Sequence, residues 1–138
     1  MPFKLSSQLS NDSLFVVDLP LCQVRLINDS QYPWLVLIPR VAGLTEIIDL
    51  TDQQQSQLWQ ESKWVSHVLR SHFAPIKLNV AMIGNVVSQL HVHHVARFTS
   101  DVSWPKPIWG QVPMQAYNDE QGLYLCNILK QQIVAMQA

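Results

Sequence analysis

The sequence is poor in charged residues. Only 14% of its 138 residues are Asp, Glu, Lys or Arg, whereas a soluble domain usually carries about 25%. Nine basic and ten acidic side chains leave a formal net charge of −1. This balance excludes the broad basic surface of a protein that grips duplex DNA, and it argues against binding to anionic membranes. A small local phosphate site is still allowed.

Long apolar runs are missing as well. No stretch approaches the roughly 20 residues that a transmembrane helix needs, and the first seven residues lack the basic start and apolar stretch of a signal peptide. The two cysteines, Cys22 and Cys126, lie far apart among apolar neighbours and form no C-x-x-C motif. We therefore expect buried, reduced thiols and a cytoplasmic protein.

The hydrophobic content of 48% is enough for one core, so we expect a single domain spanning residues 1–138. Residues 15–17, 22–28 and 34–38 have the composition and spacing of strands. A cluster of turn-forming residues separates the last two and predicts a hairpin.

A long helix is predicted from Thr51 to the residue before Pro75. Thr51 and Gln54 have the spacing of a capping box. The helix has an expected core face of Trp59, Val65 and Leu69. Its solvent face is expected to hold Gln53, Gln57, Gln60, Glu61 and Lys63.

Further strands are expected at residues 77–83 and 88–98, irregular structure at 99–114, and a helix capped by Asn118 at the C-terminal end. The order of strands, long helix, strands and helix is typical of an α+β fold with a mainly antiparallel sheet.

Three of the five histidines fall within the segment Gln89-Leu90-His91-Val92-His93-His94. On a strand, alternate side chains share a face, so Gln89, His91 and His93 are predicted to point one way, and His94 the other. Three interpretations compete: a wet sheet face, a metal site, or a nucleophilic imidazole. The metal site lacks a third ligand at a convincing spacing, and the sequence has no P-loop motif.

The segment resembles the motif H-φ-H-φ-H-φ-φ of the histidine-triad (HIT) superfamily, in which φ is hydrophobic. Aligned on Arg97, the motif has its three polar positions at Gln89, His91 and His93. Gln89 replaces the first histidine, as in a bacterial subgroup with a Q-x-H-x-H-H variant, and His94 occupies a hydrophobic position. A register shifted by two residues would make His93 the central histidine.

The resemblance extends over most of the chain, including the hairpin that ends in Ile38-Pro39-Arg40 and the segment from Trp104 to Gly110. It implies a HIT-like fold and, from the family's pattern, a ribose contact at Asn28, with a purely turn-forming role for Asn28 as an equal alternative. Phosphate contacts are implied at Asn85 and Ser88. At Trp34 several relatives carry histidine. Arg97 is expected at the surface, with a phosphate contact as the alternative. Trp104 and Trp109 are expected either to stack on a base or to pack against a second subunit.

The family transfers or hydrolyses nucleotides at the α-phosphorus through a nucleotidyl-histidine. The resemblance therefore implies that His91 is the nucleophile, that His93 stabilises charge on the phosphate, and that Gln89 helps to orient the site. The substrate would be a dinucleoside polyphosphate or a nucleoside phosphoramidate, with no metal or other cofactor and no nucleic-acid duplex. The alternative is a nucleotide-binding module that has lost catalysis. We also expect a homodimer.

Overall fold

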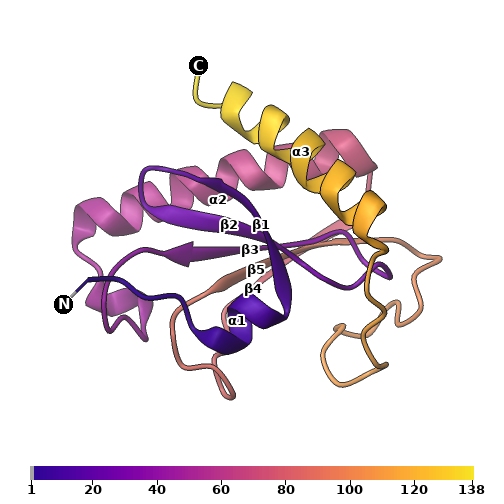
Figure 1. Ribbon diagram of the computed structural model, residues 1–138, viewed down its shortest axis with the longest axis horizontal. Coiled ribbons are helices and arrows are strands. Elements are labelled where there is room, and N and C mark those ends of the chain that lie inside the picture. Colours follow the sequence, from indigo (N-terminus) through magenta and orange to yellow (C-terminus); the bar gives the residue numbers. More distant parts are fainter. Residues whose placement is uncertain (1) are drawn as a thin grey trace.

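An antiparallel sheet of five strands forms the centre of the protein (Figure 1). The structure is a computed structural model and describes residues 2–138. The strands lie in the order β1-β2-β3-β5-β4, and each neighbouring pair is antiparallel. Their bounds are β1 Ser13–Asp18, β2 Cys22–Ile27, β3 Trp34–Pro39, β4 Lys77–Ala81 and β5 Val92–Arg97. The α+β class and the β2–β3 hairpin are confirmed.

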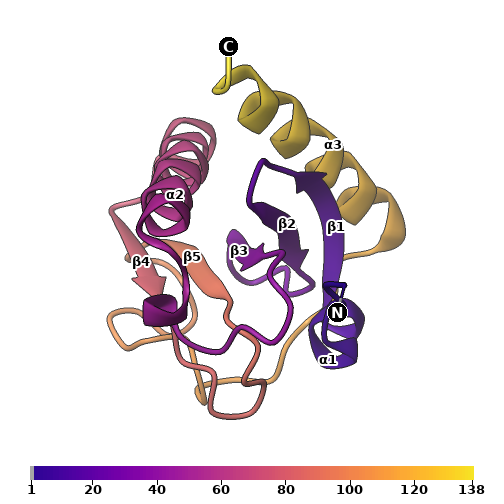
Figure 2. The ribbon, with the colours of Figure 1, turned by 90° about the vertical axis from the view of Figure 1, so that its left-hand side faces the viewer.

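Two helices cover one face of the sheet (Figure 2). They are α2, Asp52–Phe73, which packs on β3 and β5, and α3, Asp119–Ala135, which packs on β1. The short helix α1, Ser7–Asn11, packs at β1 toward the opposite face, and a single 3-10 turn, η1, covers Ile47–Asp49. Because both faces are covered, the sheet buries two hydrophobic clusters. The larger lies under α2 and α3, and the smaller contains Trp34 and Val95.

Helix α2 begins as predicted but buries a different set of residues. The Thr51 side chain accepts from the Gln54 backbone N–H, and the Gln54 side chain accepts from the Thr51 backbone N–H, so the capping box is confirmed. Trp59 is 48% exposed, and the prediction that it faces the core is wrong. The residues of α2 that are fully or nearly buried are Leu58, Glu61, Ser62, Val65, Val68 and Leu69.

Glu61 was predicted to face solvent, and this is also wrong, because it is completely buried. Its two carboxylate oxygens accept hydrogen bonds from the backbone N–H groups of Leu21 and Cys22, at 2.8 and 2.7 Å. The Gln57 amide donates a third, at 2.7 Å. A buried carboxylate is tolerated here because its oxygens are satisfied by the turn between β1 and β2.

Two further expectations need correction near the histidine segment. Strand β5 starts at Val92, so residues 88–91 lead into the strand and are not part of it. Arg97 is only 1% exposed and is not a surface residue. Its guanidinium pairs with Asp101 at 2.8 Å and also donates to the side chain of Asn79 and the carbonyl of Lys106. These partners explain how an arginine is buried there.

The strand predicted at residues 77–83 ends at Ala81, whereas the expected cap of the last helix and the buried cysteines agree with the structure. Asn118 caps α3 by accepting from the backbone N–H of Gln121 at 2.8 Å. Cys22 and Cys126 are buried and free, and burial raises the pKa of both thiols. Within residues 2–138, no helix has the length and apolar character to cross a membrane.

Candidate active site

The histidines are presented by β5 and by the residue directly before it. His93 lies on the strand, and His91 lies one residue before it. Both side chains are nearly buried, at 6% and 7% exposure. Their ring centroids are 4.8 Å apart in an edge-to-face arrangement. The prediction that these two residues share a side of the sheet therefore agrees with the structure.

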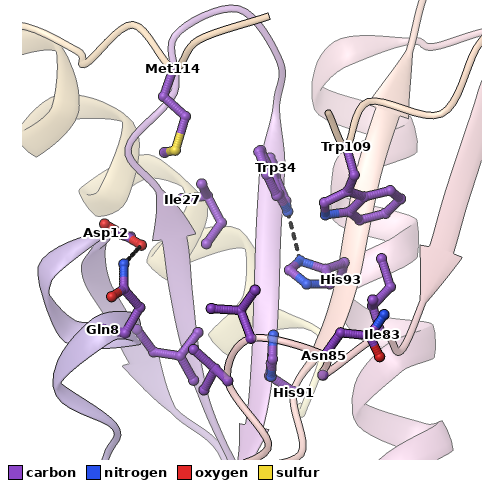
Figure 3. Close-up of a pocket in the computed structure, with 14 residues that line it drawn as sticks. Gln8, Asp12, Ile27, Trp34, Ile83, Asn85, His91, His93, Trp109 and Met114 are labelled. Atoms are coloured by element: carbon purple, nitrogen blue, oxygen red, sulfur yellow. Dashed lines mark hydrogen bonds between the residues drawn. The ribbon is translucent and has the colours of Figure 1, made fainter. Parts of the chain in front are cut away.

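Both rings line a cavity of about 400 Å³ between α1, β2, β3 and the loop after β4 (Figure 3). Most of its wall is apolar. The rings of Trp34 and Trp109 lie edge to face next to His93, with their centroids 6.1 Å apart. The other lining residues are Gln8, Leu9, Asp12, Ile27, Ile83, Gly84, Asn85, Val86, Val87 and Met114. A cavity of this size with a few polar groups in an apolar wall is typical of a small-molecule site.

The proton on His93 is assigned by Trp34. The indole Nε1–H of Trp34 donates to Nδ1 of His93 at 2.9 Å, shown as a dashed line in Figure 3. Nδ1 must accept, because an indole nitrogen can only donate. In the neutral ring the proton is then on Nε2, which is left as a donor.

The proton on His91 lies on the other nitrogen. Nδ1 of His91 is 2.6 Å from the backbone carbonyl oxygen of Gln89. A carbonyl oxygen only accepts, so Nδ1 carries the hydrogen and Nε2 keeps its lone pair. The two adjacent rings thus have opposite roles at Nε2: a lone pair on His91 and an N–H on His93.

Burial keeps His93 neutral. Removal from water, followed by the neighbouring His91 and His94, lowers the pKa of His93 from 6.5 to about 3. At neutral pH His93 therefore remains a neutral donor. This ring can stabilise charge on an anion by a hydrogen bond, but it does not supply a positive charge of its own.

A HIT domain profile matches residues 8–100 of the sequence, which include the whole histidine segment. The chain belongs to the HIT family. Its fold and sequence are also similar to those of a histidine triad protein from Bradyrhizobium japonicum, with 41% identity, coverage of 96% of this chain and 99% of that one, and a TM-score of 0.93.

Two other solved histidine triad proteins are similar over nearly their whole length. The protein from Marinobacter aquaeolei is 38% identical, with 99% of both chains covered and a TM-score of 0.95. The protein from Sinorhizobium meliloti is 34% identical, with 96% of both chains covered and a TM-score of 0.89. No curated protein sequence matches this chain.

In this HIT protein the extra histidine, His94, belongs to the opposite face of the sheet. Its Nδ1–H donates to the carbonyl of Val92 at 3.1 Å, and its Nε2 accepts from the hydroxyl of Ser62 on α2 at 2.7 Å. Burial lowers its pKa to about 4. The polar pair joins α2 to the sheet and lies outside the cavity, so His94 fills its hydrophobic position by pairing with Ser62.

The Gln89 side chain makes two contacts with the N-terminal segment. Its Oε1 accepts from the backbone N–H of Ser6 at 2.8 Å, and its Nε2 donates to the carbonyl of Lys4 at 2.9 Å. The group that holds the His91 ring is the backbone carbonyl of Gln89, which any residue offers. The side chain instead fixes the segment that leads into α1, whose Gln8 and Leu9 form part of the cavity wall.

Of the three residues expected to contact substrate, two line a cavity and one does not. Asn85 lines the main cavity, and Ser88 lines two smaller cavities beside it. Asn28 does not line these cavities, and its Oδ1 accepts from the backbone N–H of Tyr117 at 3.0 Å. The contact gives Asn28 a structural role in holding the chain before α3.

Sequence reasoning missed the polar end of the cavity. Asp12 and Gln8 lie across the cavity from His93 in Figure 3, and the Gln8 amide donates to the Asp12 carboxylate at 2.6 Å. Their spacing of four residues around a five-residue helix gave no motif. Among residues 2–138, no group of three His, Cys, Asp or Glu side chains is arranged to hold a metal ion.

Proposed function

We propose that this HIT protein is a nucleotide hydrolase or nucleotidyl transferase that acts at the α-phosphate of a nucleotide through a nucleotidyl-histidine on His91. The observation that carries the proposal is the opposite placement of protons on two adjacent rings. Nε2 of His91 offers a lone pair because Nδ1 donates to the Gln89 carbonyl. Nε2 of His93 offers a hydrogen because Nδ1 accepts from Trp34.

In the first step, Nε2 of His91 attacks the phosphorus, so an N–P bond forms and the bond to the leaving group breaks. The leaving group departs with the bonding electron pair and takes a proton from solvent. The imidazole then carries a positive charge, which the Nδ1–H bond to the carbonyl stabilises. In the second step, water or another hydroxyl attacks the phosphorus, the electron pair returns to Nε2, and a proton is released to solvent.

His93 acts as a hydrogen-bond donor in both steps. Its Nε2–H donates to a phosphate oxygen, where negative charge develops in the transition state. The ring donates a hydrogen bond but does not transfer its proton, because loss of that proton from the neutral ring would leave an imidazolate anion. The low pKa of about 3 supports this role, since the ring stays neutral across the range in which the enzyme would work.

The main cavity supports a nucleoside as the retained part of the substrate. Trp34 and Trp109 give aromatic surface for a base. Asn85 remains the proposed neutral phosphate contact. At the polar end, the Asp12 carboxylate and the Gln8 carbonyl are acceptors for sugar hydroxyls, a role that the family resemblance implied for Asn28.

The decisive experiment is to trap the intermediate. Wild-type protein is mixed with an adenosine 5′-phosphoramidate, quenched under alkaline conditions, and digested for mass spectrometry. We expect an adenylyl group on His91. The His91→Ala variant should lose turnover by several orders of magnitude while its affinity for AMP stays nearly intact, and His93→Ala should lose less.

An adenylyl group on His93, together with an inactive His93→Ala variant, would show that His93 and not His91 is the nucleophile. Nucleotide binding without turnover of phosphoramidates or dinucleoside polyphosphates would favour the binding module instead. The two departures from the motif do not support that alternative, since Gln89 still offers its carbonyl to His91 and His94 lies on the other face.

We also propose that the protein is a homodimer. Strand β4 is an edge of the sheet, and its Val80 is 43% exposed, with Ile76 just before it 66% exposed. An open edge with apolar side chains is the kind of surface that pairs with another chain. Light scattering after gel filtration tests this, and a monomer at micromolar concentration would contradict it.

A further inference from the structure

His91 borders a second cavity as well as the large one. The second has a volume of about 210 Å³ and lies between the segment that leads into η1, the loop after β4 and the approach to β5. It is lined by Thr45, Glu46, Ile47, Met82, Ile83, Gly84, Ser88, Gln89, Leu90 and His91. Ile83, Gly84 and His91 line both cavities, so the proposed nucleophile lies where they meet.

The two cavities differ in chemistry. The large one is mainly apolar, with two tryptophans in its wall. The polar residues in the wall of the second include Thr45, Glu46 and Ser88. No lysine or arginine lines these two cavities or the third one formed by Ser6, Gln8 and residues 86–89. The charged side chain of the second cavity is therefore negative.

A phosphorus attacked by His91 carries two large substituents, one that is retained and one that leaves. Both must lie close to Nε2 of His91, and His91 lines both cavities. The large apolar cavity suits the retained nucleoside. The second cavity then receives the leaving group.

Resting on the proposed function, we propose that the second cavity is the leaving-group subsite and that Glu46 selects a positively charged leaving group. A carboxylate attracts an ammonium group and repels a phosphate or carboxylate group. A polyphosphate leaving group would enter this cavity without a basic side chain to neutralise it. The substrate class that fits is a nucleoside phosphoramidate whose amine carries a second, cationic group.

The expected selectivity is moderate, because the Glu46 side chain is exposed. Exposed ion pairs are weakened by water and salt. We expect attraction to raise kcat/KM by a factor of about three to five and repulsion to lower it by a similar factor. These factors correspond to the upper range of energies for exposed ion pairs. The ratio between a cationic and an anionic leaving group should thus be about ten or more at low ionic strength.

The test uses three adenosine 5′-phosphoramidates made from butylamine, 1,4-diaminobutane and 4-aminobutanoate. All three have the same P–N bond and a chain of similar length, and differ in the charge at its far end. We expect kcat/KM to fall in the order cationic, neutral, anionic. In Glu46→Gln the cationic-to-anionic ratio should fall to about one to three, and in Glu46→Lys it should fall below one.

Asp49→Asn is the matched control, because Asp49 is an exposed carboxylate in η1, three residues from Glu46, and does not line the cavity. It should keep the wild-type ratio. Failure of the wild-type protein to cleave even the butylamine compound would contradict the proposed function. Cleavage of all three compounds with the same ratio in wild type and Glu46→Gln would overturn the subsite alone.

Discussion

Trp34 and His93 are diagonal neighbours on adjacent strands, and one hydrogen bond joins them. Strands β3 and β5 pair Trp34 with Val95 and Val36 with His93, so the two side chains lie on the same face. The indole N–H reaches Nδ1 of His93 at 2.9 Å, and the ring centroids are 5.6 Å apart. The sheet register therefore decides which nitrogen of His93 carries the proton toward the cavity.

Replacing Trp34 with Phe should lower the rate and alter the tautomer of His93. The aromatic bulk is kept, while the donor is lost, so the Nδ1–H form of the ring becomes accessible. We expect kcat to fall about 2- to 12-fold, equivalent to a neutral hydrogen bond of about 0.5–1.5 kcal/mol. Nitrogen-15 NMR of labelled histidine should show a mixture of tautomers at His93 instead of the Nε2–H form.

Trp109→Phe is the control for that variant, because Trp109 contacts His93 ring to ring at 5.2 Å in the same cavity. It should leave the His93 tautomer unchanged, whatever it does to KM. An unchanged tautomer in Trp34→Phe would contradict the positioning role.

Replacing Gln89 with Ala should affect substrate binding more than the chemical step. The carbonyl that holds His91 belongs to the backbone and remains, while both contacts to Lys4 and Ser6 are lost. We expect KM to rise several-fold, kcat to change less, and hydrogen exchange to speed up in residues 4–12. Gln89→Glu keeps an acceptor for Ser6 but has no donor for Lys4, so its effect should be intermediate.

The opposite split for Gln89, with a large loss in kcat and unchanged exchange in the N-terminal segment, would show that the side chain acts on His91 directly. Protection of residues 4–12 is the measurement that separates the two roles.

Removing the Glu61 carboxylate should destabilise the fold strongly. Glu61→Ala leaves the backbone N–H groups of Leu21 and Cys22 buried without their acceptor. We expect a loss of about 2–5 kcal/mol in the free energy of unfolding, measured by urea denaturation. Gln60→Ala, at the exposed neighbouring position, should change stability by less than about 0.5 kcal/mol. Equal effects of the two substitutions would contradict the role of Glu61.

Acid should destabilise the protein through His93 and His94 before either ring is protonated in the folded state. Their pKa values are about 3 and about 4 in the fold and about 6.5 in the unfolded chain. Between pH 6.5 and these values the unfolded chain binds the extra protons, so stability falls as pH falls. The limiting slope is about 1.4 kcal/mol per pH unit for each histidine.

His94→Gln removes one of these titrations. The free energy of unfolding of this variant, measured between pH 7 and pH 4.5, should fall less steeply with acid than that of the wild type, even if the variant is less stable at pH 7. Parallel curves for the two proteins would contradict the low pKa of His94.

Local patterns in the sequence were enough to predict the features that arise from neighbouring residues. The β2–β3 hairpin follows from two apolar runs around turn formers, and the start of α2 follows from the spacing of Thr51 and Gln54. Alternation along an extended segment placed His91 and His93 together and His94 on the other side. These signals are local, because each depends on backbone geometry within a few residues.

Contacts between groups far apart in the chain could not be predicted in this way, because they depend on the folded arrangement. The buried state of Glu61 depends on a turn 40 residues earlier in the chain, and the His93 tautomer depends on a tryptophan 59 residues away. The hydrogen bond between the Gln89 side chain and the backbone N–H of Ser6 joins residues 83 positions apart. A charged or polar side chain looks solvent-exposed in a sequence unless its partner is known, because burial is tolerated only where a hydrogen-bond partner is supplied. The folded chain supplies those partners, and it also brings Glu46 and His91 into the wall of one cavity.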